Sequence, residues 1–144
     1  MSGEKAIIVS ACLLGENCKY NGGNNRNERV LRYVEGHEVI TVCPEMLRGE
    51  PCPRKPVEWV GERVLTKDGD DCTENFRLGV QKAMDIIGDK HIDLAILQSR
   101  SPTCGVKQIY DGTFSGVRID GLGALARALH ERGIPLMDAE DVPD

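Results

Sequence analysis

Three of the six cysteines in this 144-residue chain, Cys12, Cys43 and Cys104, each follow a short apolar segment that is typical of a buried strand. In an open parallel α/β sheet, ligands bind outside the carboxyl ends of the strands. Three thiols delivered to that edge predict one site that holds a metal or an iron–sulfur centre and leaves one coordination position open. An open position is more typical of a catalyst than of a structural site.

The three cysteines are far apart in the sequence, and none belongs to the clustered C-x₂-C-x₂-C pattern of ferredoxin-type electron carriers. Dispersed ligands favour a cluster in a preformed pocket, which suits chemistry better than electron relay. The alternative is that they are buried, inert cysteines, because free cysteine is among the most buried residue types. Cys18 could be a further ligand, although Gly15 and Asn17 predict a loop that carries it away. For Cys52 and Cys72 we expect inert or surface roles.

Composition predicts a single domain over residues 1–144, with 40% hydrophobic and 28% charged residues. A formal net charge of −5 argues against a general nucleic-acid binder, which usually carries a basic surface. Aromatic residues make up only 4% of the chain, which argues against a stacking platform for single-stranded RNA. A small-molecule substrate is still compatible with an acidic protein, because a pocket need not be basic overall.

No apolar segment approaches the ~20 residues of a membrane span, and the first ten residues do not resemble a signal peptide. We therefore expect a soluble cytoplasmic protein without a membrane partner. In that reducing compartment, six cysteines favour metal binding or catalysis over disulfides.

Continuous apolar runs at Ala6–Val9, Glu38–Val42 and Ile92–Leu97 predict strands that are covered on both faces of a parallel sheet. A short terminal strand is expected at Ile134–Met137, where Pro135 favours an edge position. The sequence does not determine the order of these strands in the sheet.

Helical periodicity predicts three helices between these strands. The first covers Asn27–Val34, the second is capped by Asp71 or Thr73 and ends at Gly88, and the third begins at Asp120 or Gly121 and ends at Gly133. Between the second strand and the second helix lies a proline-rich insert. It includes a predicted hairpin, 57–66, which we expect to cover one edge of the sheet. The order of elements predicts an α/β fold: a single Rossmann-like three-layer domain with a mainly parallel sheet.

Six ordered motifs extend over nearly the whole chain: SACLLGENCKYNGG at 10–23, VCPE at 42–45, Pro53-Arg54, KDGDDCTENFRLG at 67–79, SPTCG at 101–105 and IYDGTFSG at 109–116. Together they resemble a small bacterial and archaeal family, long known only as a domain of unknown function, to which thiouracil desulfidases belong. The resemblance implies a 4Fe–4S cluster held by three cysteines, with the fourth iron free of protein ligands. It also implies that the substrate's thiocarbonyl sulfur binds that iron and that hydrolysis releases the oxo base and sulfide.

Carried over motif by motif, the resemblance assigns the cluster ligands to Cys12, Cys43 and Cys104, the same residues that the strand-end argument selects. The acidic residue after the CPE proline is Glu45, which we favour as a general base that activates water. Its alternative role is that of a solvated carboxylate. The serine that opens SPTCG is Ser101, which has either a catalytic role or a structural role in the turn before Pro102.

The chain departs from the family pattern at four positions. Lys19 and Asn21 stand where the family usually has Arg and Asp, Gln98 stands where Lys is frequent, and Thr103 replaces a common Ser. These changes leave the proposed ligands intact, but Lys19, Asn21 and Gln98 could alter the choice of substrate. Asp111, in an Asp-Gly pair, is expected to form a turn.

The sequence thus predicts a non-redox, 4Fe–4S-dependent desulfidase that acts on thiouracil or a related thiolated pyrimidine. The expected partner is this small molecule, with no stable nucleic-acid complex, and the expected state is a monomer or a small homo-oligomer. One alternative is an iron–sulfur or zinc module that senses redox state or stabilises the domain without catalysis. Another is a sulfur carrier that works through a single thiolate without metal.

Overall fold

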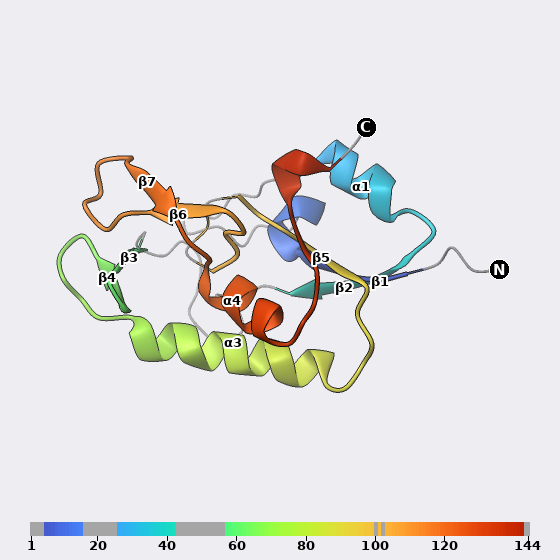
Figure 1. Ribbon diagram of the computed structural model, residues 1–144, viewed down its shortest axis with the longest axis horizontal. Helices are drawn as coiled ribbons and strands as arrows, with labels where there is room; N and C mark the ends of the chain where they lie inside the picture. The colour runs from blue at the N-terminus through green and yellow to red at the C-terminus, as the bar shows by residue number, and fades with distance from the viewer. Residues whose placement is uncertain (1–4, 16–25, 43–56, 100, 102, 143–144) are drawn as a thin grey trace.

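The computed structural model describes residues 5–15, 26–42, 57–99, 101 and 103–142. Its centre is a four-stranded sheet formed by β1 (Ala6–Ser10), β2 (Glu38–Val42), β5 (Leu94–Leu97) and β8 (Leu136–Asp138). The strand order is β2-β1-β5-β8, and every neighbouring pair is parallel. The predicted α/β class with a mainly parallel sheet is confirmed, and β8 lies at an edge, as Pro135 suggested (Figure 1).

Helices cover both faces of the sheet, because the central strands are apolar on both sides. Ile8 of β1 points into a cluster with α3 (Thr73–Ile87) and α4 (Ala124–Glu131). Its neighbours Ile7 and Val9 pack on the opposite face with Val30 and Val34 of α1 (Glu28–Val34). All three β1 side chains are fully buried, so this strand is the centre of a three-layer core.

The ends of the first two predicted helices are set by local hydrogen bonds. Asn27 caps α1 by accepting hydrogen bonds from the backbone N–H groups of Arg29 and Val30. The N-cap residue of α3 is Cys72 and not Asp71 or Thr73 as predicted, although the Asp71 carboxylate accepts a hydrogen bond of 2.9 Å from Thr73 N. Hydrogen bonds from the side chain and the backbone of Thr73, together with the Arg63 guanidinium, lower the pKa of Asp71 to about 2. At its other end α3 stops at Gly88, where φ is +58°.

The predicted start of the third helix was wrong. Residues Arg118–Asp120 form β7, which pairs antiparallel with β6 (Gln108–Tyr110), and α4 begins only at Ala124. Ile119 faces Ile109 across this pair, so pairing with the preceding strand decides the conformation. Gly121 and Gly123 then delay the helix, because glycine is a poor helix former.

The predicted hairpin is present as β3 (Val57–Val60) and β4 (Arg63–Thr66), joined at Gly61 with φ of +62°. It forms a separate two-stranded sheet and does not cover an edge of the main sheet, so that part of the prediction was wrong. Its Trp59 and Val64 pack instead on Phe76 of α3 and Ile109 of β6. The two hairpins therefore lie together at one end of the molecule (Figure 1).

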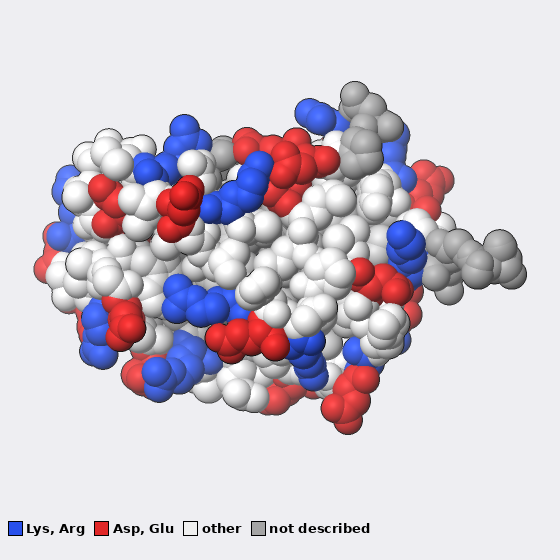
Figure 2. Space-filling model, in the orientation of Figure 1, with Lys and Arg blue, Asp and Glu red and all other residues white. Residues whose placement is uncertain are grey.

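Two short 3₁₀ helices, η1 (Ala11–Leu14) and η2 (Ala139–Asp141), directly follow β1 and β8. Within the described ranges no helix has the length and apolar character that a membrane crossing requires. Acidic and basic side chains are interspersed over the face drawn in Figure 2.

Candidate functional site

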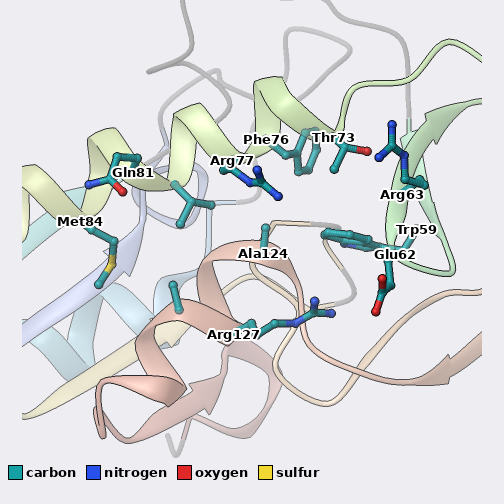
Figure 3. Close-up of a pocket in the computed structure, with 12 residues that line it drawn as sticks. Trp59, Glu62, Arg63, Thr73, Phe76, Arg77, Gln81, Met84, Ala124 and Arg127 are labelled. Carbon is teal, nitrogen blue, oxygen red and sulfur yellow. The ribbon is translucent and has the colours of Figure 1, made fainter.

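A groove of about 520 Å³ lies between the β3–β4 hairpin, α3 and α4. Arg77 from α3 and Arg127 from α4 line it together with Trp59 (Figure 3). The Arg127 guanidinium stacks over the Trp59 ring, 5.1 Å from its centroid, so this cation already has an aromatic partner. Among the residues that the structure describes, Cys12, Cys72, Cys104 and Ser101 do not line this groove.

The carboxyl edge of the main sheet is where the predicted ligands belong. β1 lies between β2 and β5, so the three strands that precede the three cysteines are immediate neighbours. Ser10 at the end of β1 pairs with Val42 at the end of β2. On its other side Ser10 accepts a hydrogen bond of 3.0 Å from Gln98 N, just after β5. All three strands therefore end at the same level, which the sequence could not show.

Cys12 follows β1 on η1 and is 9% exposed. It packs in the cluster on the α1 face of the sheet, with Val30 and Val34. Gly15, with φ of +100°, ends η1 and donates a backbone hydrogen bond to Cys12 O. Glycine adopts this conformation without the strain that a side chain would cause.

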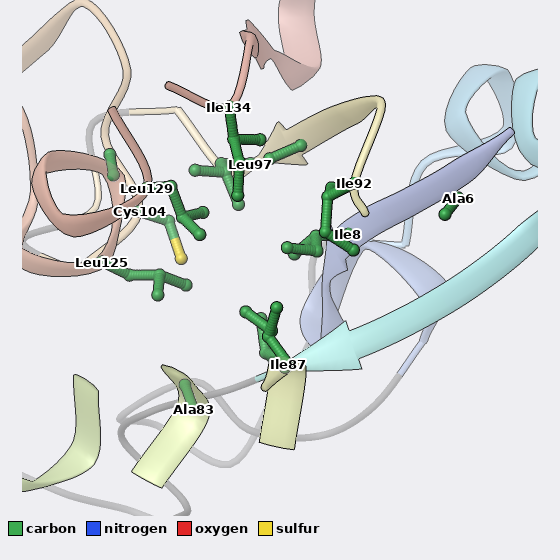
Figure 4. Packing of buried hydrophobic residues seen from close by; sticks show 13 residues of the cluster. Ala6, Ile8, Ala83, Ile87, Ile92, Leu97, Cys104, Leu125, Leu129 and Ile134 are labelled. Carbon is green, nitrogen blue, oxygen red and sulfur yellow. The ribbon is translucent and has the colours of Figure 1, made fainter. Parts of the chain in front are cut away.

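Cys104 lies in the loop after β5 and is 6% exposed. It packs in the cluster on the other face, beside Leu125 and Leu129 of α4 (Figure 4). Cys12 and Cys104 thus lie at one edge but in apolar clusters on opposite faces. Within the described ranges no group of three His, Cys, Asp or Glu residues is placed to hold a metal ion, and the third predicted ligand, Cys43, lies outside those ranges.

Ser101 holds the loop that carries Cys104. Its Oγ accepts hydrogen bonds of 3.0 Å from Thr103 N and from Cys104 N. Its carbonyl accepts a third, of 2.8 Å, from Gly105 N. The structural role that the sequence left open for Ser101 is therefore present. The hydroxyl still has its own proton to donate, because both side-chain bonds use it as an acceptor.

The start of α4 fixes the same loop from the other side. Leu125 N donates to Thr103 O and Gly123 N donates to Gly105 O, both at 2.8 Å. A Cβ atom at Gly123 would lie 2.4 Å from the carbonyl carbon of Thr103. Only glycine allows this approach, so Gly123 is required for the position of the Thr103–Cys104 peptide.

Sequence reasoning missed a second set of hydrogen bonds and an ion pair at this edge. Ser99, after β5, donates a hydrogen bond to the buried carboxylate of Asp138 at the end of β8, which also accepts one from Glu140 N. Nearby, Lys107 Nζ lies 2.9 Å from Asp141 Oδ2, and this hydrogen bond raises the pKa of Lys107. The only signal in the sequence was that Ser99 and Asp138 stand at the ends of apolar runs.

The remaining predicted residues divide into two groups. Gln98 is half-buried at the carboxyl edge. Cys72 lies before α3 and packs against the hairpin cluster, which consists of Trp59, Val64, Phe76 and Ile109. Asp111 accepts hydrogen bonds from Thr113 N and Thr113 Oγ1 in a turn, as predicted. Six further positions lie outside the described residues: Cys18, Lys19, Asn21, Cys43, Glu45 and Cys52.

Comparison with known proteins gives three similarities. A model of the 2-thiouracil desulfurase family matches residues 7–141. The uncharacterized protein YbbK of Bacillus subtilis (strain 168) is 33% identical over 148 residues, covering 96% of this chain and 98% of its own length. The solved structure of the 4Fe–4S-dependent thiouracil desulfidase TudS matches with a TM-score of 0.87 and 36% identity, covering 97% of this chain and 94% of TudS.

These matches extend over almost the whole chain and agree with the resemblance that the six ordered motifs carry. The fold, the strand ends and the motif order lead to the same assignment. The chain belongs to the 2-thiouracil desulfurase family.

Proposed function

We propose that this protein is a 4Fe–4S-dependent desulfidase that converts thiouracil or a related thiolated pyrimidine to the oxo base and sulfide. One observation supports this most: the three strands that lead into Cys12, Cys43 and Cys104 are adjacent and parallel, in a chain of the 2-thiouracil desulfurase family. The reaction adds water across the thiocarbonyl carbon and releases hydrogen sulfide, so it requires no net electron transfer.

The residues present fit such a cluster. Thiolates are the ligands that iron–sulfur centres use, and Cys12 and Cys104 are both buried, which shields a cluster from solvent. Next to Cys104, the buried Thr103 hydroxyl has no hydrogen-bond partner. We propose that Cys12, Cys43 and Cys104 hold the cluster. When bound, it supplies a Lewis-acidic iron that polarises the thiocarbonyl and accepts the departing sulfur.

Glu45 is our proposed general base. Its position two residues after Cys43 puts a carboxylate close to a proposed ligand in the sequence, where it can take a proton from the attacking water. We assign Ser101 two tasks: its oxygen holds the Cys104 loop, and its proton is available to orient that water. A small-molecule substrate rather than a nucleic acid agrees with the formal net charge of −5. We further propose that the protein is cytoplasmic, since a reducing compartment keeps the thiols available. We propose a monomer or a small homo-oligomer as its state.

Removal of the Ser101 hydroxyl should separate its two tasks. Ser101→Ala leaves Thr103 N and Cys104 N without an acceptor, so we expect a loss of about 1 kcal/mol in unfolding free energy. If the proton also orients water, turnover per loaded cluster should fall by at least ~10-fold. Ser101→Thr, which keeps the hydroxyl, is the control. Unchanged turnover per cluster in Ser101→Ala would leave Ser101 with the structural task alone.

A methyl group at Gly123 should displace the Cys104 loop. Gly123→Ala places Cβ against the Thr103 backbone, and we expect a loss of about 3 kcal/mol in stability, the upper end for overpacking. Cluster content should fall with it. Gly116→Ala is the control, because Gly116 has open space around it and its positive φ costs about 1 kcal/mol alone. Equal cluster content in the two variants would show that the loop does not depend on Gly123.

Iron and acid-labile sulfide content after anaerobic purification tests the class of protein. A 4Fe–4S enzyme should contain about four of each per chain, whereas zinc without sulfide would indicate a structural module. Neither metal nor sulfide after reconstitution would indicate a sulfur carrier. A full cluster without thiouracil desulfuration would instead favour a sensing module.

A further inference from the structure

The side chain of Thr103 is buried but unsatisfied. Thr103 is 2% exposed, and its Oγ1 is the one buried side-chain oxygen or nitrogen among the described residues that has no hydrogen-bond partner. Other buried polar side chains at this edge are paired: Ser10 with Gln98 N, and Ser99 with Asp138. Native proteins rarely leave a buried hydroxyl unpaired, because its desolvation is then not compensated.

The backbone of Thr103 is fixed, so the hydroxyl cannot find solvent by a small shift of the loop. Its N–H donates to Ser101 Oγ at 3.0 Å, and its carbonyl accepts from Leu125 N at 2.8 Å. Gly123 packs directly against its carbonyl carbon. The same contacts that fix Cys104 therefore keep the Thr103 hydroxyl buried beside it.

We infer that the Thr103 hydroxyl donates a hydrogen bond to a sulfur atom of the iron–sulfur cluster that Cys104 helps to hold. This inference rests on the proposed function. A cluster bound at Cys104 would bring several sulfur acceptors close to Thr103. Hydrogen bonds to these sulfurs are one of the factors that set the reduction potential of a cluster. Thr103 is thus a positioning residue for the cluster. The substitution of the family's common serine by threonine keeps the donor.

The test compares Thr103→Val, which replaces the hydroxyl by a methyl group, with Thr103→Ser, which keeps it. Thr66→Val is the matched control, since Thr66 is also buried but its Oγ1 already accepts a hydrogen bond of 3.0 Å from Asp70 N in the hairpin region. All variants are reconstituted anaerobically. The readouts are the cluster's reduction potential, its rate of loss to an iron chelator, and the denaturation midpoint of the cluster-free protein.

In Thr103→Val we expect a lower reduction potential, because the donor stabilises the more negative reduced cluster, and a loss of cluster at least several-fold faster than in the wild type. Thr103→Ser and Thr66→Val should resemble the wild type in both. In the cluster-free protein we expect the opposite ranking of the two valine variants. Thr103→Val should be at least as resistant to denaturant as the wild type, since it removes an unpaired hydroxyl. Thr66→Val should be less resistant, since Asp70 N loses its acceptor.

An unchanged potential and an unchanged rate of cluster loss in Thr103→Val would overturn the inference. If Thr103→Val takes up no cluster, Thr103→Ala against Thr103→Ser gives the same comparison, and equal values would overturn it. A wild-type protein that binds no cluster would overturn the proposed function as well. A wild-type cluster that desulfurates thiouracil, with no effect in Thr103→Val, would overturn this inference alone.

Discussion

Replacement of Cys12, Cys43 or Cys104 by serine should abolish both the brown absorption of the cluster and all desulfuration. Serine is a harder ligand and is protonated at neutral pH, so it cannot replace a thiolate on iron. Two variants serve as controls, Cys52→Ser and Cys72→Ser, and both should keep cluster and activity. Cys72 is the more informative of the two, because it packs against the hairpin cluster, away from the carboxyl edge. The measurement is visible absorbance and turnover on the same anaerobic samples.

Cys18 decides whether the site is open. If Cys18→Ser alone abolished the cluster, a closed four-cysteine site would replace the open one, and a mechanism that needs a vacant iron would fail. If Cys18→Ser keeps the cluster and Cys12→Ser loses it, the result agrees with a site of three cysteine ligands.

Replacement of Glu45 by glutamine should lower turnover by ~10²–10⁴-fold, the usual effect of losing a general base. Glutamine keeps the shape and hydrogen-bonding capacity of the side chain but has no basic site, so the cluster and the binding of the thiolated base should be retained. The measurement is cluster content and steady-state desulfuration on one sample.

A solvated carboxylate at this position would behave differently. Substitution of a solvated carboxylate changes stability little, so Glu45→Gln would then keep near-normal turnover. Near-normal turnover with a full cluster would remove Glu45 from the mechanism. Ser101 or bulk water would then be the remaining groups that could activate the nucleophile.

The sequence predicted the strands well, because each contains a short run of apolar residues. β1 is buried along its whole length, whereas β2 is an edge strand that is only partly buried but has the predicted bounds. For β5, the predicted run at Ile92–Leu97 begins two residues early. The start of α4 could not be predicted in the same way. Residues Arg118–Asp120 have no local strand signal of their own and become β7 because β6 lies beside them.

The site was predicted in its residue types more fully than in its geometry. Cysteines after apolar runs could be recognised, but their convergence depends on the order β2-β1-β5, which only the fold determines. The contacts that fix Cys104 were also not visible in the sequence. Ser101 was ambiguous until its two backbone donors were known, and Gly123 is critical only because the chain returns to within van der Waals distance of Thr103.

Stoichiometric product formation without a redox partner tests the central claim most directly. The reconstituted wild-type protein is incubated anaerobically with thiouracil and with neither reductant nor oxidant, and uracil and sulfide are quantified together. We expect many turnovers per chain with equal amounts of uracil and sulfide, and none in the cluster-free protein. Product limited to one equivalent per chain, a requirement for an electron donor, or equal turnover by the cluster-free protein would contradict a non-redox desulfidase that works at an open iron.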